Sequence, residues 1–168
     1  MLCRNCKKKI SLVFIDLGNS PISNAYLDRK EDLKNELKYP LKVLFCNSCW
    51  LVQTDDRVKV DNIFNKNYAY FSSYSSSWLK HASNYVDKMV SRFNLNSKSQ
   101  VLEIASNDGY LLQYFKKKNI PCYGIEPTES TANASKNKGI DVIIDFFSKK
   151  LANKLIQERG CADLVIAN

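Results

Sequence analysis

The sequence predicts an α/β protein with two parts. A small β-rich four-cysteine zinc module comes first, and a partial Rossmann-like domain with about four parallel strands follows it. Two observations predict this fold. Within the first 60 residues, four cysteines occur as two Cys-x2-Cys pairs. From residue 99 onward, short apolar runs alternate with amphipathic helical patterns.

These patterns divide the chain into three segments. We expect a zinc-binding module over residues 1–60, an aromatic and serine-rich segment with a linking helix over residues 61–98, and the N-terminal half of a Rossmann-like domain over residues 99–168. The N-terminus has no signal-peptide pattern, and no apolar run approaches the roughly 18 residues of a membrane span. We therefore expect a cytoplasmic protein that makes no membrane contact.

The paired cysteines predict a metal site. Cys3 and Cys6 form one pair, and Cys46 and Cys49 form the other. Two residues between thiols let both sulfurs of a turn face one ion, so two such turns supply the four ligands of tetrahedral Zn²⁺. A closed four-thiolate site has no open position. The zinc is therefore expected to be structural and to replace the apolar core that so small a module lacks.

The rest of the module is expected to be β-rich. A turn is predicted at Gly18-Asn19-Ser20-Pro21. The predicted strands cover residues 11–17, 41–45 and 50–53. Modules of this type bind nucleic acid or brace a neighbouring domain. The two unpaired cysteines, Cys122 and Cys161, lie in or beside strand-like runs and are expected to be core residues.

The net charge of +8 raises the question of nucleic-acid binding. Most of the basic residues are lysines, scattered along the chain and accompanied by many asparagines. Proteins that read bases favour arginine for its bidentate geometry. The charge is therefore assigned to composition, and a nucleic-acid partner is not expected.

Residues 68–78 are rich in tyrosine, phenylalanine and serine. This composition suits either the lining of a polar pocket or a surface loop. From Ser77 the apolar spacing becomes helical as far as Phe93, and a serine among residues 75–77 is expected to cap the helix. This helix carries His81, which is the single histidine of the chain.

The last segment predicts a parallel sheet with right-handed crossovers. Strands are predicted at residues 100–105, 121–125, 140–144 and 162–167, and helices at 109–118, 128–138 and 149–159. Ligands of such sheets bind beyond the carboxyl ends of the strands. The candidate cofactor-binding residues at these ends are Glu103, Ala105, Asn107, Asp108, Gly109, Glu126, Pro127, Asp145, Phe146 and Asn168.

The residues at the strand ends favour S-adenosylmethionine as the cofactor. The chain has no Gly-x-x-x-x-Gly-Lys motif, and Asp108 would repel a pyrophosphate at the helix N-terminus. A cofactor with adenosine, an ammonium group and no phosphate tolerates that acid. Glu126 is placed to bind ribose hydroxyls, and Asp145 with Phe146 is placed to bind adenine.

Several segments together resemble the zinc-containing sugar C-methyltransferases, which include the dTDP-sugar 3-C-methyltransferases of deoxysugar biosynthesis. They run in the order Cys-x2-Cys, LGNSPISNAYL, YPLKVLFCNSCWLVQ, YAYFSSYSSSWLKHA, VLEIASNDGYLLQYF, GIEPT and DFF. The resemblance implies a class I methyltransferase fold, four cysteine zinc ligands, and a first methyltransferase motif over residues 103–109. It also implies a small nucleotide-sugar substrate, with Tyr70 and His81 as the candidate catalytic residues.

The chain departs from this family in length. Family members continue beyond the position of Asn168 with further strands and with the histidines and glutamate expected to act as base. We therefore expect a truncated or split member that is inactive alone, with a poorly soluble exposed last strand. A separate chain could supply the missing half. The alternative is a zinc-ribbon module that binds nucleic acid or a protein partner and carries a non-catalytic sheet, but this leaves the acids at the strand ends unexplained.

Overall fold

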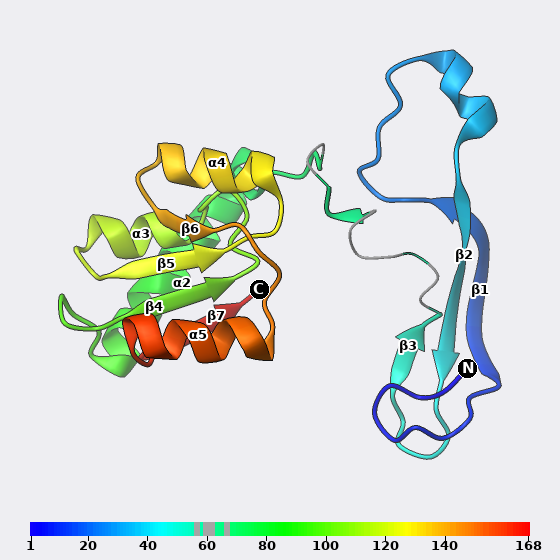
Figure 1. Cartoon of the computed structure of the whole chain (residues 1–168), viewed down its shortest axis with the longest axis horizontal. Coiled ribbons are helices and arrows are strands. Elements are labelled where there is room, and N and C mark those ends of the chain that lie inside the picture. The colour runs from blue at the N-terminus through cyan, green and yellow to red at the C-terminus, as the bar shows by residue number, and fades with distance from the viewer. Residues whose placement is uncertain (56–57, 59–62, 66–67) are drawn as a thin grey trace. The chain divides into compact units, whose positions relative to one another are not determined.

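The computed structural model describes residues 1–55, 58, 63–65 and 68–168. The chain divides into two compact units, Met1–Ile63 and Phe64–Asn168 (Figure 1). The boundary predicted between residues 60 and 61 lies outside the described residues. In the described parts of the chain, no helix is both long and apolar enough to cross a membrane.

The first unit contains a three-stranded antiparallel sheet in the order β1-β2-β3 (Figure 1). Its strands are β1 (Leu12–Pro21), β2 (Lys38–Phe45) and β3 (Val52–Thr54). A 3-10 helix, η1 (Lys30–Asn35), lies between β1 and β2. Strands that are neighbours in this sheet therefore also follow one another in the chain. The segment with η1 connects β1 to β2, and the second cysteine pair lies between β2 and β3.

The turn predicted at residues 18–21 is wrong. These residues continue β1, and Ser20 and Pro21 pair with Tyr39 and Lys38 of β2. The backbone is irregular at Gly18, which has φ +74° and whose amide donates a hydrogen bond to the Asp16 carboxylate at 3.1 Å. The strand nevertheless continues beyond this point. The pairing register shifts at this point, so Gly18 forms a bulge within the strand rather than a turn between strands.

The core of the first unit is very small. It consists of Cys3, Ile10, Leu44 and Cys46, with Leu51 and the other two cysteines packed against it. Every residue of β1 except Ser20 is exposed. Because so little apolar surface is buried, the hydrophobic effect alone cannot account for the stability of this unit.

The second unit is built on a parallel sheet, which confirms the predicted fold class. The strand order is β6-β5-β4-β7 (Figure 1). The bounds are β4 (Val101–Ile104), β5 (Cys122–Ile125), β6 (Asp141–Ile143) and β7 (Leu164–Ala167). The chain runs outward from β4 to β6 and then returns to the other side of β4. The carboxyl ends of β4 and β7 therefore flank the switch point of the sheet, where such folds bind ligands.

Helices cover both faces of this sheet. They are α2 (Ser76–Phe93), α3 (Leu112–Lys117), α4 (Glu129–Asn137) and α5 (Lys149–Arg159). Along β4, Val101 packs in a cluster with Val86 of α2 and Phe115 of α3, whereas Leu102 packs with Leu151 of α5. Alternate residues of the central strand thus point into two separate cores.

The ends of α2 explain its position in the chain. The Ser75 hydroxyl accepts a hydrogen bond from the Trp78 amide at 3.2 Å, which caps the first turn as predicted. Asn94, with φ 52°, ends the helix.

The two unpaired cysteines lie in different surroundings. Cys122 is half-buried against the core, but Cys161 is exposed, so the prediction that Cys161 is a core residue is wrong. Cys161 follows the Gly160 cap of α5 and lies in the connection to β7.

Candidate functional site

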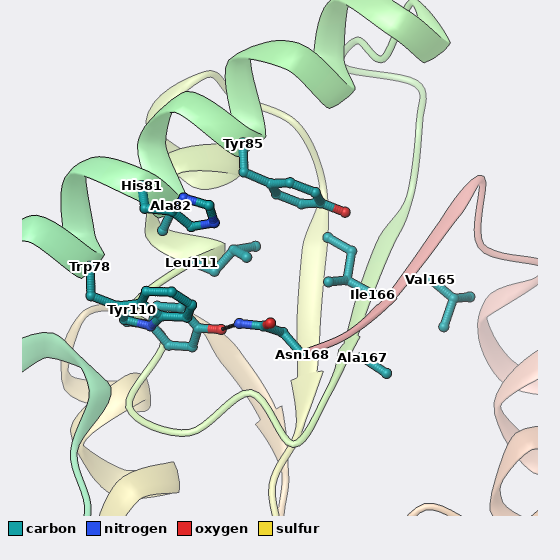
Figure 2. Close-up of a pocket in the computed structure, with 10 residues that line it drawn as sticks. All are labelled: Trp78, His81, Ala82, Tyr85, Tyr110, Leu111, Val165, Ile166, Ala167 and Asn168. Carbon is teal, nitrogen blue, oxygen red and sulfur yellow. Dashed lines mark hydrogen bonds between the residues drawn. The ribbon is translucent and has the colours of Figure 1, made fainter. Parts of the chain in front are cut away.

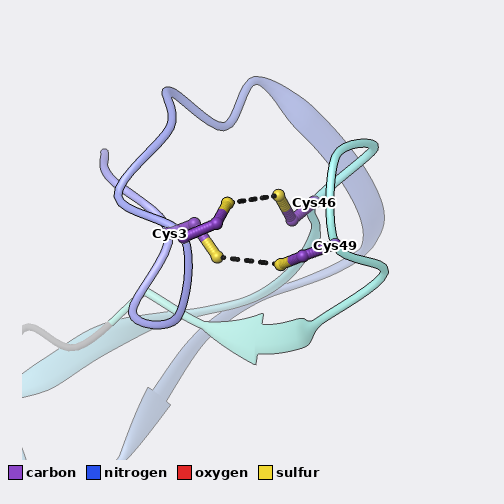
Figure 3. Close-up of side chains that lie close together, drawn as sticks. Cys3, Cys46 and Cys49 are labelled. Carbon is purple, nitrogen blue, oxygen red and sulfur yellow. Dashed lines mark hydrogen bonds between the residues drawn. The ribbon is translucent and has the colours of Figure 1, made fainter.

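The four paired cysteines form one cluster. Their sulfur atoms all lie within 4.8 Å of one another. The Cys3 and Cys49 sulfurs are 3.5 Å apart (Figure 3). The Cys6 and Cys46 sulfurs are 3.6 Å apart. Tetrahedral Zn²⁺ with Zn–S bonds of about 2.3 Å requires S–S separations of about 3.8 Å. The sulfurs are therefore spaced almost as zinc requires.

The two cysteine turns have matching backbones, which explains how two distant segments present their thiols alike. The Lys7 amide donates to the Cys3 carbonyl at 3.0 Å, and the Trp50 amide donates to the Cys46 carbonyl at 2.8 Å. Lys7 and Trp50 both have positive φ, at 60° and 65°. Each turn thus closes four residues after its first cysteine.

Backbone amides at the second turn favour thiolates. The Leu51 amide lowers the pKa of Cys49 to about 6, and the Ser48 amide lowers the pKa of Cys46. The pKa of Cys6 rises to about 11 despite the Lys8 amide, because burial and the three neighbouring thiols favour its neutral form. Zn²⁺ binds thiolates and displaces such protons, so the cluster fits the ion chemically.

The loop after β4 has an unusual backbone. Positive φ occurs at every second residue, at Ala105 (55°), Asn107 (50°) and Gly109 (74°). Glycine is the usual residue in this left-handed region, and asparagine tolerates it. Residues 105–109, here called the β4–α3 loop, therefore have a glycine-rich turn's geometry with a single glycine.

Replacing Ala105 with glycine should stabilise the second unit by about 1 kcal/mol, because alanine in the left-handed region costs about 1 to 2 kcal/mol and glycine is more flexible when unfolded. The measurement is the urea midpoint of Trp78 fluorescence in a Trp50→Phe background, which leaves Trp78 as the only tryptophan. The same change at Ala134, inside α4, should destabilise by about 0.5 to 1 kcal/mol. If both variants changed the stability in the same direction, the proposed backbone strain at Ala105 would be contradicted.

Asn107 and Glu126 hold the β4–α3 loop in place. The Glu126 carboxylate accepts from the Asn107 amide with Oε2 and from the Thr128 amide with Oε1, both at 2.9 Å. The Asn107 side chain accepts from the Ser72 amide at 2.9 Å and donates to the Tyr70 carbonyl at 3.0 Å. The loop is therefore fixed on one side by the acid that follows β5 and on the other by the chain that precedes α2.

Three buried acids converge here. Glu103, Asp108 and Glu126 are 0%, 3% and 4% exposed. Among the described residues, Oδ1 of Asp108 has no hydrogen-bond partner, and the Glu103 carboxyl has no donor beside it except the Tyr110 hydroxyl. Buried carboxylates without partners are costly. The site is thus suited to a cationic ligand that brings hydrogen-bond donors.

Glu103 has the most perturbed pKa of these acids. Burial raises its pKa well above the ordinary value of 4.5; the Tyr110 hydroxyl offsets part of the rise, and the charges of Glu126 and Asp108 add to it. Glu103 lies on the central strand between Gly124 and Ile166, which are its partners on β5 and β7. This position in the sheet keeps water away from the carboxyl.

The Glu103 carboxyl predicts a pH dependence of stability. The unfolded chain releases this proton near pH 4.5, whereas the folded chain retains it to higher pH. Stability from this group is therefore complete below about pH 4.5 and falls as the pH rises through the elevated pKa. Glu103→Gln should remove that fall, so the variant should exceed the wild type in urea midpoint at pH 8 but not at pH 5. Parallel pH profiles, followed by Trp78 fluorescence, would contradict it.

A cavity of about 380 Å³ lies beside the loop, between α2 and β7 (Figure 2). Trp78 and His81 stack on one wall with ring centroids 5.0 Å apart and an interplanar angle of 10°. The Asn168 amide donates to the Tyr110 hydroxyl at 2.7 Å across the cavity. Burial raises the pKa of Tyr110 to about 12, so its hydroxyl stays neutral.

The candidate catalytic and cofactor-binding residues fall into four places. Glu103, Ala105, Asn107, Asp108, Gly109, Glu126 and Pro127 lie at the ends of β4 and β5, and His81 and Asn168 line the cavity. Asp145 and Phe146 are exposed after β6, where the Phe146 amide donates to Asp145 Oδ1 at 2.7 Å. The Tyr70 side chain is half-exposed, and its backbone carbonyl accepts a hydrogen bond from the Asn107 side chain of the loop.

Sequence reasoning missed two residues of this region. Tyr110 lines the cavity, and its place directly after Gly109 in the loop motif was a usable signal. Lys138 binds the loop from the end of α4, and no local pattern distinguishes it from the other lysines.

A four-thiolate module and a parallel sheet with an acid-lined switch point define a zinc-binding protein with a Rossmann-like ligand domain. Residues 3–64 match a family described as "Putative zinc binding domain", and residues 84–166 match "Methionine biosynthesis protein MetW". The C-methyltransferase NovU of Streptomyces niveus is 28% identical over 163 residues, which cover 97% of this chain and 39% of NovU. The chain thus spans about two fifths of that relative.

Among solved structures, the plantazolicin methyltransferase BpumL in complex with SAH is 18% identical. The match covers 46% of this chain and 38% of BpumL, with a TM-score of 0.28. The zinc-domain match and the four-cysteine cluster agree on a zinc-binding module in the first unit.

Proposed function

We propose that this chain is the zinc-binding and cofactor-binding part of an S-adenosylmethionine-dependent C-methyltransferase whose acceptor is a nucleotide-linked keto-deoxysugar. The observation that carries the proposal is the set of buried acids at the switch point, where Oδ1 of Asp108 has no hydrogen-bond partner among the described residues. S-adenosylmethionine carries both an ammonium and a sulfonium, so its charge complements these acids. The similarity to NovU, a C-methyltransferase, supports the same chemistry.

The loop residues have separate roles in this proposal. Asp108 and Glu103 offer carboxylate oxygens to the ammonium group, and Glu126 supports the loop and faces the ribose. The alternating positive φ at Ala105, Asn107 and Gly109 turns the backbone so that the loop can lie close to the cofactor. When bound, S-adenosylmethionine supplies a methyl group activated by positive charge on sulfur.

The cavity is proposed to hold the acceptor sugar. The Trp78 ring offers an apolar face to a sugar ring, and Asn168 offers polar contacts at the end of β7. His81, which lines the cavity, and Tyr70, whose carbonyl accepts a hydrogen bond from the Asn107 side chain, are the candidate catalytic residues of this part of the enzyme. When bound, S-adenosylmethionine would supply the methyl group to the carbon beside the keto group and would leave as S-adenosylhomocysteine, and that carbon would lose one proton.

Calorimetric titration of the full 168-residue chain with S-adenosylhomocysteine tests the proposal. We expect one ligand per chain, with ATP as a control that does not bind because its phosphates meet Asp108. Glu126→Gln should weaken the affinity by about tenfold, because an amide cannot accept from both the Asn107 and Thr128 amides as a carboxylate does. A zinc-loaded chain that binds no S-adenosylhomocysteine would overturn the proposal.

A further inference from the structure

The chain that precedes α2 is attached to the β4–α3 loop by several hydrogen bonds. This aromatic segment, residues 68–74, ends in the 3-10 helix η2 (Ser72–Tyr74). The Asn107 side chain bridges the Tyr70 carbonyl and the Ser72 amide. The Ser73 amide donates to Oδ2 of Asp108 at 3.2 Å. Two consecutive side chains of the loop therefore bind three positions of a segment about 35 residues away.

Lys138 completes this attachment from a third element. It is the residue that ends α4, and its ammonium donates to the Ser73 hydroxyl at 2.8 Å and to the Asp108 carbonyl at 2.6 Å. It also forms an ion pair with Asp108 Oδ2 at 3.5 Å. The three protons of the ammonium group are thus directed at the loop and the segment together.

The charge on Lys138 is needed where it lies. The Asp108 side chain is only 5% exposed, and Lys138 is the one cation paired with it among the residues that the structure describes. A buried carboxylate that loses its ion partner destabilises whatever holds it in place. Removing the ammonium therefore loosens both the loop and the segment, rather than the surface of α4 alone.

We propose that Lys138 is a positioning residue that holds the aromatic segment against the β4–α3 loop. Cofactor binding and the docking of the aromatic segment are then energetically linked. The link follows because Asn107 and Asp108 serve both partners. A ligand that fixes these two side chains also fixes the acceptors of the Ser72 and Ser73 amides. By reciprocity, a docked segment presents a preorganised loop to the ligand. The inference rests on the proposed function in that the ligand is S-adenosylmethionine or its product.

Hydrogen exchange of the Ser72 and Ser73 amides, measured on the full chain without ligand, tests the fastening directly. Lys138→Met removes the ammonium and keeps much of the side-chain length. We expect the Ser73 amide to exchange at least about tenfold faster in this variant. Lys136→Met is the matched control, since Lys136 is exposed, lies on the same helix and has no side-chain bond to the loop among the described contacts. It should change exchange less than twofold. The Leu102 amide of β4 should be unaffected in both variants.

Two measurements with ligand test the linkage. S-adenosylhomocysteine should slow the exchange of the Ser72 and Ser73 amides in the wild type. In calorimetry, Lys138→Met should weaken the affinity of the chain for S-adenosylhomocysteine by about fivefold to tenfold. Lys138→Arg, which keeps the charge, should restore most of the affinity. If Lys138 acted only by repelling the ligand's ammonium, Lys138→Met would bind more tightly, and that result would overturn the linkage.

The two proposals can fail separately. Unchanged Ser73 exchange in Lys138→Met overturns the fastening, whatever the ligand does. A wild type that binds no S-adenosylhomocysteine overturns the proposed function and the linkage, whereas exchange without ligand still decides whether Lys138 fastens the segment.

Discussion

Replacing Cys46 with serine will abolish zinc binding and unfold the unit Met1–Ile63. Among the described residues of this unit, the apolar core consists of four buried residues, and two of them are cysteines. A structural Zn²⁺ site contributes about 10 to 16 kcal/mol at neutral pH, which equals or exceeds the whole stability of a typical domain. No other interaction in the described part of the unit approaches that size.

The measurement is the zinc content of the purified chain together with amide exchange across β1 and β2. We expect one zinc per wild-type chain and none in Cys46→Ser, with loss of protection in both strands. Cys161→Ser is the matched control, because Cys161 is exposed and lies outside the cluster. Its zinc content and protection should equal those of the wild type. A Cys46→Ser chain that kept one zinc and a protected sheet would contradict the four-cysteine site.

Replacing Gly109 with alanine will destabilise the second unit by about 2 to 5 kcal/mol, through about 1 to 2 kcal/mol of backbone strain and about 1 to 3 kcal/mol of overpacking. Gly109 has φ +74°. A Cβ there would lie 2.5 Å from both Ile140 Cδ1 and Ser135 Oγ. Both of these residues are buried, so neither can move aside cheaply. The variant should also lose affinity for S-adenosylhomocysteine, because the β4–α3 loop must shift.

Gly139→Ala separates the two causes. Gly139 lies in the same unit with φ +72°, but the atoms that an added Cβ would meet there belong to the flexible end of Lys116. This variant should therefore show the strain, about 1 to 2 kcal/mol in the urea midpoint, with little overpacking. It also displaces the Lys116 ammonium from the Lys138 and Gly139 carbonyls, but those hydrogen bonds are exposed. Equal losses for the two variants would mean that the packing of Gly109 against Ile140 and Ser135 contributes nothing.

Periodicity and spacing were enough to predict the framework of the molecule. Two Cys-x2-Cys pairs have few structural uses, so their spacing alone predicts the four-cysteine cluster. Alternating apolar runs with short connections imply parallel pairing, and parallel pairing places strand ends at one edge of the sheet. The approximate positions of Glu103, Asn107 and Glu126 follow from that rule alone.

Features that depend on distant contacts could not be predicted in the same way. Gly18 and Pro21 favour a turn locally, but the pairing of Ser20 with Tyr39 keeps the strand intact. The wall formed by Trp78 and His81 faces β7 because of how α2 packs, which no local pattern reveals. Lys138 resembles every other lysine of the sequence until α4 brings its ammonium to Asp108.

The chain separation of the two cysteine turns also affects how the protein is made. Cys3 and Cys6 leave the ribosome about 45 residues before Cys49, which at about 5 to 20 residues per second is a delay of roughly 2 to 9 seconds. During that interval the first pair offers only two thiols, and two thiols hold zinc far less firmly than four. The order of synthesis therefore makes the second turn the step that captures the metal, and it leaves the first pair open to oxidation or to a competing ion until then.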